Sequence, residues 1–427
     1  MKDLQTIDET LRYLQFDGWE QRDPGLSRAR ELLSLLGDPQ NKLKFVHIAG
    51  TNGKGSTAAM LASVLQSAGY RTGLYTSPHL LRFHERMRVN GAEIDDGSLI
   101  SLTNAVRAAA AQLREPPTGF EIMTAIAFLY FAQERCDIVS LEVGLGGRLD
   151  PTNVIPAPEV CAVTNIGLEH TALLGGTLEQ IAAEKCGIIK RGSHAVLYSQ
   201  TAGVEAVARE KCAREGVPLT VTAPETLVRL SSSLDGQTFT YRGRGPYRLR
   251  LLGEYQLLNA LTVLDICAAL RARGWSALTD GALAAGLSSA QWHGRLELLR
   301  RRPDFLVDGA HNPQCADALM TSLSALYGDK KLVFLTGVLR DKDWRQMLRR
   351  ALPLAKAFVV LTPPSARALD ENELAAWLNA QGMPAVPAAD AEDGVRRALA
   401  LAGEEGAVCS WGSLYFTGEV RRALTER

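Results

Sequence analysis

The sequence predicts an α/β protein that contains a doubly wound, mostly parallel sheet. Apolar runs of strand length alternate with helical patterns along the chain, and this alternation stops once and starts again. A glycine-rich turn links the first of these strands to a helix, as in a phosphate-binding P-loop. A chain of 427 residues exceeds one ordinary domain, so we expect two domains, 1–292 and 296–427.

The phosphate loop follows the predicted strand 44–49, and we expect a helix over 56–68 after it. Glycines let backbone N–H groups converge on one anion, Lys54 adds a positive charge, and the helix N-terminus adds its dipole. The spacing differs from the usual G-x-x-x-x-G-K-[ST], because residue 48 is Ile and Gly55 separates Lys54 from Ser56. The combination still favours nucleotide binding over an ordinary turn. The candidate nucleotide-binding residues of the loop are Thr51, Asn52, Gly53, Lys54, Gly55 and Ser56.

The first alternation continues with further strands and helices. Parallel sheets bind ligands at the carboxyl ends of their strands, and both Ser77 and Glu142 fall at or just after such ends. Between about 193 and 252 the pattern changes to short polar strands and turns, which we interpret as a small antiparallel appendage to the first domain. A helix is expected from near Tyr255. The other predicted elements are strands 71–76, 137–143 and 160–165 and helices 120–134 and 178–189.

The second alternation begins after Arg295 and predicts a smaller, Rossmann-like α/β domain. This part has no phosphate loop of its own, so we expect it to share its chemistry with the first domain across a hinge. Its predicted strands are 304–308, 331–337, 356–361 and 407–411, and its predicted helices are 313–327, 343–351, 370–381 and 391–403.

The balanced charge composition argues against nucleic acid and membrane surfaces as binding partners. Lys plus Arg and Asp plus Glu both number 47, so no basic field favours nucleic acid or an anionic membrane surface. No segment has the apolar length of a membrane helix and the N-terminus is not signal-like, so we expect a cytoplasmic protein, as a monomer, with small-molecule substrates. Seven cysteines occur singly with no C-x-x-C pair, which argues against disulfides and a zinc site and favours buried apolar positions.

Five motifs carry a family resemblance. They are Thr76-Ser77-Pro78-His79-Leu80, the segments 141–153 (LEVGLGGRLDPTN), 165–170 (NIGLEH) and 184–190 (EKCGIIK), and Asp308-Gly309-Ala310-His311-Asn312-Pro313. With the phosphate loop, and in this order, they make nearly the whole chain resemble the Mur ligase superfamily, and within it the folylpolyglutamate and dihydrofolate synthases. Only about fifty residues precede the loop, too few for the separate UDP-sugar domain of cell-wall Mur ligases. We therefore expect a folate substrate.

The resemblance implies that ATP phosphorylates a carboxylate and that the amine of L-glutamate attacks the acyl phosphate. It assigns Ser77, Glu142 and His170 as ligands of magnesium, which prefers oxygen donors and keeps several waters. It also implies that Lys185 is carbamylated, which would replace a cation by an anion next to the metal. The local pattern allows another interpretation of Lys185, a solvated helix lysine paired with Glu184.

The resemblance places the other nucleotide contacts further along the chain. It assigns Asn259 and Asp308 to the adenine and ribose end, and His311 to the incoming glutamate or the nucleotide. Arg295 at the hinge has the planar fork that suits bidentate contacts to the γ-phosphate. Segment 411–415 resembles the family and is a candidate lining of the glutamate pocket. The alternative for 308–313 is a plain strand-to-helix turn, with Pro313 starting the helix.

The folate side is assigned by the same resemblance. The run Gly144–Gly147 with Arg148–Asp150 resembles the family's mobile Ω-loop. His79, Arg82 and His84 border the expected pterin or p-aminobenzoate side, with Phe120 as a stacking candidate, although each alone fits a structural role. Residues 17–23 fit the bifunctional family members less well, which favours the polyglutamate activity over the dihydropteroate activity.

We therefore expect an ATP- and Mg2+-dependent ligase that adds L-glutamate to the γ-carboxylate of tetrahydrofolates, with dihydropteroate as an open second substrate. The catalytic candidates are Lys54, Lys185, Arg295 and His311. Three alternatives stay open: a ligase of UDP-linked cell-wall precursors, a P-loop NTPase or kinase, and a nucleotide-binding protein with a degenerate site. A kinase or NTPase would turn over without glutamate, which distinguishes it from a ligase.

Overall fold

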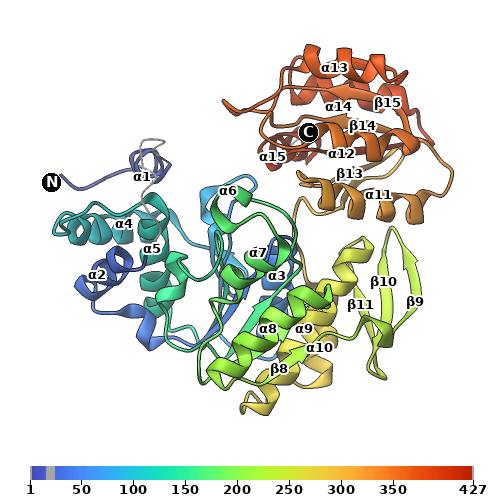
Figure 1. The fold of residues 1–427 in the computed structure, drawn as a ribbon. Coiled ribbons are helices and arrows are strands. Elements are labelled where there is room, and N and C mark those ends of the chain that lie inside the picture. The colour runs from blue at the N-terminus through green and yellow to red at the C-terminus, as the bar shows by residue number, and fades with distance from the viewer. Residues whose placement is uncertain (1, 16–24, 426–427) are drawn as a thin grey trace. The chain divides into compact units, whose positions relative to one another are not determined.

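The computed structural model describes residues 2–15 and 25–425 (Figure 1). Residues 17–23, which bear on the choice between folate substrates, lie outside the described residues. The chain forms two compact units. The first comprises Met1–Leu227, Tyr241–Tyr247 and Leu258–Ala290, and the second comprises Val228–Thr240, Arg248–Leu257 and Gln291–Arg427. The second unit thus includes two segments from before residue 290.

An eight-stranded sheet forms the centre of the first unit. Its strand order is β4-β3-β2-β5-β1-β6-β7-β8, and all pairs from β2 to β8 are parallel, while β3 and β4 run antiparallel. This confirms the predicted doubly wound, mostly parallel sheet. The strands are β1 Phe45–Ala49, β2 Thr72–Tyr75, β3 Met87–Val89, β4 Ala92–Glu93, β5 Ile138–Glu142, β6 Val160–Val163, β7 His194–Leu197 and β8 Leu219–Val221.

Several helices of the first unit begin at polar N-caps and bury apolar residues. Thr118 and Glu121 form a capping box at the start of α5, and Thr177 and Gln180 form one at the start of α7. Helix α3 is largely buried and packs closely on α10, where Gly286 approaches its backbone. The helices are α1 Ile7–Leu14, α2 Ser27–Leu35, α3 Lys54–Ser67, α4 Asp96–Ala110, α5 Gly119–Gln133, α6 Thr171–Leu174, α7 Leu178–Cys186, α8 Ala202–Glu215, α9 Glu254–Ala272, which starts in the second unit, and α10 Asp280–Ser289.

The prediction for residues 193–252 was wrong in its first half. Strands β7 and β8 extend the parallel sheet, and α8 connects them as a βαβ crossover. Only 227–249 form the antiparallel sheet, in the order β11-β10-β9. The error arose because β7 and β8 have only four and three residues and each includes a polar one, so their apolar pattern is weak. The strands are β9 Leu227–Ser233, β10 Gly236–Tyr241 and β11 Arg244–Leu249.

The second unit has its own six-stranded sheet, in the order β12-β13-β17-β14-β15-β16. Only β12 is antiparallel to its neighbour, which agrees with the predicted α/β domain. The strands are β12 Glu297–Arg300, β13 Asp304–Val307, β14 Leu332–Thr336, β15 Ala355–Val360, β16 Ala385–Pro387 and β17 Ala407–Trp411. The helices are α11 Pro313–Tyr327, α12 Trp344–Ala351, α13 Glu371–Ala380, α14 Ala391–Ala402 and α15 Leu414–Thr425.

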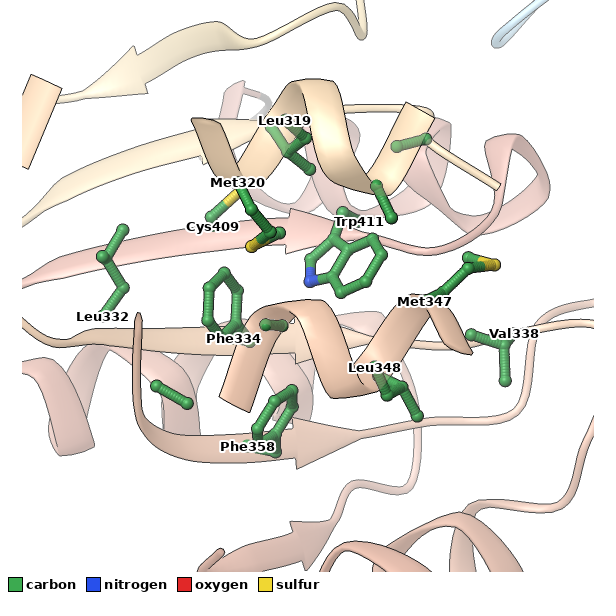
Figure 2. Packing of buried hydrophobic residues seen from close by; sticks show 14 of the residues in the cluster. Leu319, Met320, Leu332, Phe334, Val338, Met347, Leu348, Phe358, Cys409 and Trp411 are labelled. Carbon is green, nitrogen blue, oxygen red and sulfur yellow. The ribbon is translucent and has the colours of Figure 1, made fainter. Parts of the chain in front are cut away.

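Trp411 lies in the core of this unit rather than in a pocket. Figure 2 shows its ring among Phe334, Met320 and Leu319, and its centroid lies 6.2 Å from that of Phe334 in an edge-on arrangement. Trp411 is fully buried, so this residue of segment 411–415 does not line a substrate pocket. Tyr415 of the same segment is 52% exposed.

Two expectations from composition can be compared with the structure. All seven cysteines have free thiols, and six are buried while Cys315 is half-buried, as expected for apolar packing. Within 2–15 and 25–425, none of the helices combines the length and apolar character needed to cross a bilayer.

Candidate functional site

The phosphate loop lies at the carboxyl end of β1, the buried central strand of the large sheet. Helix α3 begins at Lys54 rather than at Ser56 as expected, because Gly53 adopts a left-handed φ of 87° and serves as its N-cap. The loop is fixed from the neighbouring strand: Thr51 and Asn52 donate their N–H groups to the Asn165 carbonyl at 2.8 and 3.2 Å. The helix N-terminus therefore opens directly into the loop.

Two glycines of the loop cannot be replaced without moving a neighbour. A Cβ on Gly50 would lie 1.8 Å from Thr164 Oγ1, and a Cβ on Gly53 would lie 2.5 Å from Asn259 Oδ1. Asn259 of α9 thus lies against the loop, while its assignment to the adenine and ribose end stays a prediction. Sequence reasoning missed Thr164, which donates to the Asn52 carbonyl at 2.9 Å. The available signal was its place directly before the NIGLEH motif.

Two lysines converge on one carbonyl of this loop. Lys54 Nζ donates to the Gly50 and Thr51 carbonyls at 3.0 and 3.2 Å, and Lys185 Nζ donates to the Gly50 carbonyl at 2.8 Å. Lys185 is only 4% exposed. Burial, followed by the charge of Lys54, lowers the pKa of Lys185 to about 7. A large fraction of Lys185 is therefore a neutral amine near pH 7.

The alternative of a solvated Lys185 is wrong. Its neighbour Glu184 faces the other way and forms a bidentate ion pair with Arg148, with Arg148 Nη2 donating at 3.0 Å. The backbone of Gly147 lies so close that a Cβ there would be 2.8 Å from the Lys185 carbonyl. The segment after Glu142 and the end of α7 therefore pack on each other.

Glu142 and Ser77 meet at the carboxyl edge of the sheet, as expected. Glu142 ends β5, Ser77 follows the neighbouring strand β2, and the Ser77 N–H donates to Glu142 Oε2 at 3.0 Å. Glu142 is buried, so its carboxylate is held in place at this edge. His170 has a φ of 53° and immediately precedes α6. In the described part of the chain no three His, Cys, Asp or Glu side chains form a group that could hold a metal ion.

The folate-side candidates have different surroundings. The Phe120 ring covers Gly144, where a Cβ would lie 2.5 Å from it. His79 Nδ1 accepts from Arg86 Nε at 2.9 Å, and burial with the Arg86 charge lowers the pKa of His79 to about 4. His84 is buried and hydrogen-bonded to Asp96 at 2.8 Å, which is a structural role. Arg82 forms a surface ion pair with Glu93 at 3.7 Å.

The candidate residues of the second unit surround Asp308, which follows β13. Its buried carboxylate accepts from Leu296 N at 2.7 Å and from Tyr255 Oη at 2.8 Å through one oxygen, and from Ala310 N at 2.7 Å through the other. Burial raises the pKa of Asp308. Tyr255 was missed as a site residue, although it lies one helical turn before Asn259 in α9.

Arg295 and His311 both lie against Gly309, the residue after Asp308. A Cβ on Gly309 would lie only 2.2 Å from Arg295 Nη1. The same Nη1 donates to the Gly294 carbonyl at 3.1 Å. His311 Nδ1 donates to the Gly309 carbonyl at 2.8 Å, which assigns the proton to Nδ1. Asn312 caps α11 by accepting from Cys315 N at 2.8 Å. Segment 308–313 is thus a strand-to-helix turn that also gathers the three predicted side chains of this unit.

Comparison with known proteins explains this set of residues. The protein family described as "Mur ligase middle domain" matches residues 48–267. A second, described as "Mur ligase, glutamate ligase domain", matches residues 294–414. The chain belongs to the Mur ligase family.

Relatives of this Mur ligase cover nearly its whole length. It is 35% identical over 416 residues to the dihydrofolate synthase/folylpolyglutamate synthase of Bacillus subtilis, covering 94% of this chain and 95% of the relative. It is 34% identical to the folylpolyglutamate synthase of Lacticaseibacillus casei, covering 93% and 94%. The family resemblance found from the motifs is confirmed, and the relatives give no support to a cell-wall substrate or a general NTPase.

Solved structures resemble the fold of this Mur ligase closely. Folylpolyglutamate synthase of Mycobacterium tuberculosis, complexed with ADP and AMPPCP, superposes with a TM-score of 0.89 at 31% identity and covers 99% of both chains. The bifunctional synthase of Yersinia pestis, complexed with AMPPNP and Mn ion, gives 0.86 at 30% identity, again covering 99% of both.

Proposed function

We propose that this Mur ligase uses ATP to join L-glutamate to the γ-carboxylate of tetrahydrofolates through an acyl phosphate. The observation that carries the proposal is the convergence of Lys54 and buried Lys185 on the Gly50 carbonyl of the phosphate loop. A carboxylate is a poor electrophile and repels the anionic nucleotide, so phosphoryl transfer needs cations held at a fixed place. The loop supplies one such cation in Lys54, the first residue of α3, and the helix N-terminus adds its dipole.

In the proposed mechanism the loop amides and Lys54 bind the phosphates of ATP. Arg295 contacts the γ-phosphate, Asn259 and Asp308 hold the adenine and ribose end, and His311 lies beside the incoming glutamate. The protein supplies no covalent nucleophile: it orients the folate carboxylate towards the γ-phosphate and then the glutamate amine towards the acyl carbon. The phosphate leaves as the amide forms.

A divalent metal fits the donors at the sheet edge. The Glu142 carboxylate accepts the backbone N–H of Ser77, so a carboxylate and a hydroxyl-bearing residue are neighbours at this edge. These donor types suit magnesium, and we assign His170 as the third ligand. When bound, the metal neutralises the charge that develops on the phosphate oxygens. Glu142 and Ser77 keep their place because the two strands that carry them are hydrogen-bonded neighbours.

Lys185 is proposed to react with carbon dioxide: its Nζ forms a bond to the carbon, one N–H proton is released to solvent, and the product is a carbamate anion. The reaction needs a neutral amine, and the lowered pKa of about 7 supplies one near neutral pH. The carbamate would carry a negative charge beside Lys54. Carbon-13 NMR in 13C-bicarbonate should show a carbamate signal in the wild-type protein that Lys185→Met lacks, and equal signals would remove the assignment.

The ligase activity is tested by ADP release from purified protein. The assay contains Mg2+, ATP, L-glutamate and either tetrahydrofolate or dihydropteroate, with each component omitted in turn. We expect ADP only when glutamate and a pterin acid are both present. The two acids are compared because the relatives include a dihydrofolate synthetase from Saccharomyces cerevisiae, 34% identical over 384 residues. ADP release that ignores glutamate would contradict the proposal.

A further inference from the structure

A buried chain of hydrogen bonds lies beneath the site and has no role in the mechanism above. It links His47 of β1 to Thr152 and Asp150. Thr152 lies in the short 3-10 helix η3, Pro151–Val154, and Asp150 is the N-cap of that helix. His47 Nε2 lies 2.8 Å from Thr152 Oγ1, and Thr152 Oγ1 donates to Asp150 Oδ1. All three residues are buried.

The direction of these bonds follows from proton counting. A hydroxyl has one proton, and Thr152 Oγ1 donates that proton to the Asp150 carboxylate. In its bond to His47, Thr152 Oγ1 must therefore be the acceptor. The imidazole then carries its proton on Nε2. Burial, followed by the charge of Lys190, lowers the pKa of His47 well below its usual value, so the ring is neutral. Lys190 also holds the far end of η3, donating to the Asn153 and Ile155 carbonyls at 2.8 and 2.6 Å.

Asp150 also hydrogen-bonds to the backbone of the glycine run 144–147. Its second oxygen accepts the Leu145 N–H at 2.9 Å, while Oδ1 also accepts the Thr152 N–H at 2.9 Å. The run begins two residues after Glu142, and its last residue, Gly147, packs against the backbone of Lys185. The hydrogen-bonded chain from β1 therefore ends on the backbone of this run, which follows Glu142 in the sequence and packs on Lys185.

We propose that His47 and Thr152 are positioning residues: through Asp150 they fix the glycine run between Glu142 and Lys185 and so raise turnover without touching substrate. The proposal rests on the function proposed above, because that function places Glu142 and Lys185 at the reacting centre. Reacting groups displaced by about an ångström lose about a hundredfold in rate, so a loosened run lowers kcat. The phosphate loop keeps its own bonds to Asn165, so ATP binding is unaffected.

The test compares Thr152→Val with two other variants. Valine keeps the shape but removes the hydroxyl, whereas Thr152→Ser keeps the hydroxyl. Thr220→Val is a matched control, because Thr220 Oγ1 makes the same bond to His194 Nε2, at 2.9 Å, between β7 and β8 of the same sheet. We expect Thr152→Val to lower kcat about tenfold or more with KM for ATP within about twofold, and Thr152→Ser and Thr220→Val to stay near wild type.

Hydrogen exchange of the ligand-free proteins provides a second measurement that does not need activity. The amides of 144–150 should exchange about tenfold faster in Thr152→Val and at the wild-type rate in Thr220→Val. Wild-type kcat in Thr152→Val, a kcat loss without faster exchange at 144–150, or an equal loss in Thr220→Val would each overturn the proposal. Absence of glutamate-dependent ADP release by the wild type would instead refute the proposed function. In that case the hydrogen-exchange rates would still show whether the hydrogen bonds from His47 through Thr152 to Asp150 hold residues 144–147 in place.

Discussion

At the residue scale, burial changes the chemistry of side chains whose sequence context is ordinary. Lys185 follows Glu184 in a helix and would be a surface lysine by pattern, yet it is enclosed and donates to the Gly50 carbonyl. Moving an ammonium group out of water favours its neutral form, and the nearby charge of Lys54 adds to this effect. The residue is therefore suited to reaction as an amine.

The lowered pKa of Lys185 makes stability depend on pH. Between about pH 7 and the unfolded pKa near 10.5 the unfolded chain binds more protons at this residue, so its contribution to stability rises with pH. In bicarbonate-free buffer, the free energy of unfolding of wild type relative to Lys185→Met should increase over this range, by at most about 1.4 kcal/mol per pH unit. Urea unfolding at several pH values measures this difference. A difference independent of pH would mean that Lys185 has an ordinary pKa.

Glu142 provides a second prediction at this scale. Its carboxylate lies at the sheet edge and is the only acidic metal ligand proposed for the site, so Glu142→Ala should abolish ADP release at every magnesium concentration tested. The measurement is a magnesium titration of wild type and variant, with thermal unfolding as the control for folding. Recovery of activity at moderately raised magnesium would show that Glu142 lies outside the metal's ligand shell.

At the element scale, the β1 to α3 connection shows why the phosphate loop needs glycine at particular places. Gly53 and Gly69 flank the same helix, and both have a φ of 87°. A side chain at Gly53 meets Asn259, whereas at Gly69 nothing lies within 4 Å. A side chain at Gly69 would therefore cause backbone strain alone, whereas a side chain at Gly53 would cause the same strain and also crowd Asn259.

Alanine at each of these glycines tests that separation. Gly69→Ala should cost about 1–2 kcal/mol in unfolding free energy and leave KM for ATP unchanged. Gly53→Ala should cost at least as much and weaken ATP binding about tenfold or more, because Asn259 is displaced. Denaturant unfolding and nucleotide titration measure the two effects. Equal ATP affinity in both variants would show that Asn259 does not depend on the close approach of Gly53.

At the scale of the whole molecule, each of the two units carries its own sheet and its own group of site residues. Lys54, Glu142 and Lys185 belong to the first unit, and Arg295 and Asp308 belong to the second. Glu142 and Asp308 lie at the ends of parallel strands, which deliver side chains to one edge of a sheet, whereas Lys185 lies near the end of α7 and Arg295 precedes β12. The net charge of zero fits a protein whose specificity lies in such local groups rather than in a general field.

Nucleotide binding should appear in the stability of the whole chain. A ligand at one hundred times its Kd stabilises the folded state by about 2.7 kcal/mol, so saturating Mg-ATP should raise the Tm of the wild type by several degrees. The rise should be absent in Lys54→Ala, because that variant lacks the main phosphate cation. Calorimetry with and without Mg-ATP measures both. An equal rise in the two proteins would place the nucleotide elsewhere.

The sequence by itself determined the fold class, the phosphate loop and the family, because these depend on local patterns and on motif order. It also placed Ser77 and Glu142 at strand ends, and the neighbouring strands β2 and β5 bring them together. It failed for β7 and β8, whose short strands carry little periodicity and are stabilised by pairing with the existing sheet.

Only the tertiary structure decided the environment of each side chain. It buried Lys185, brought Thr164 and Asn259 against the loop glycines, placed Trp411 in the core and joined Tyr255 to Asp308. These facts depend on contacts between residues far apart in the chain. Burial and hydrogen-bond partners set pKa values and positions, and they arise only when distant segments pack together.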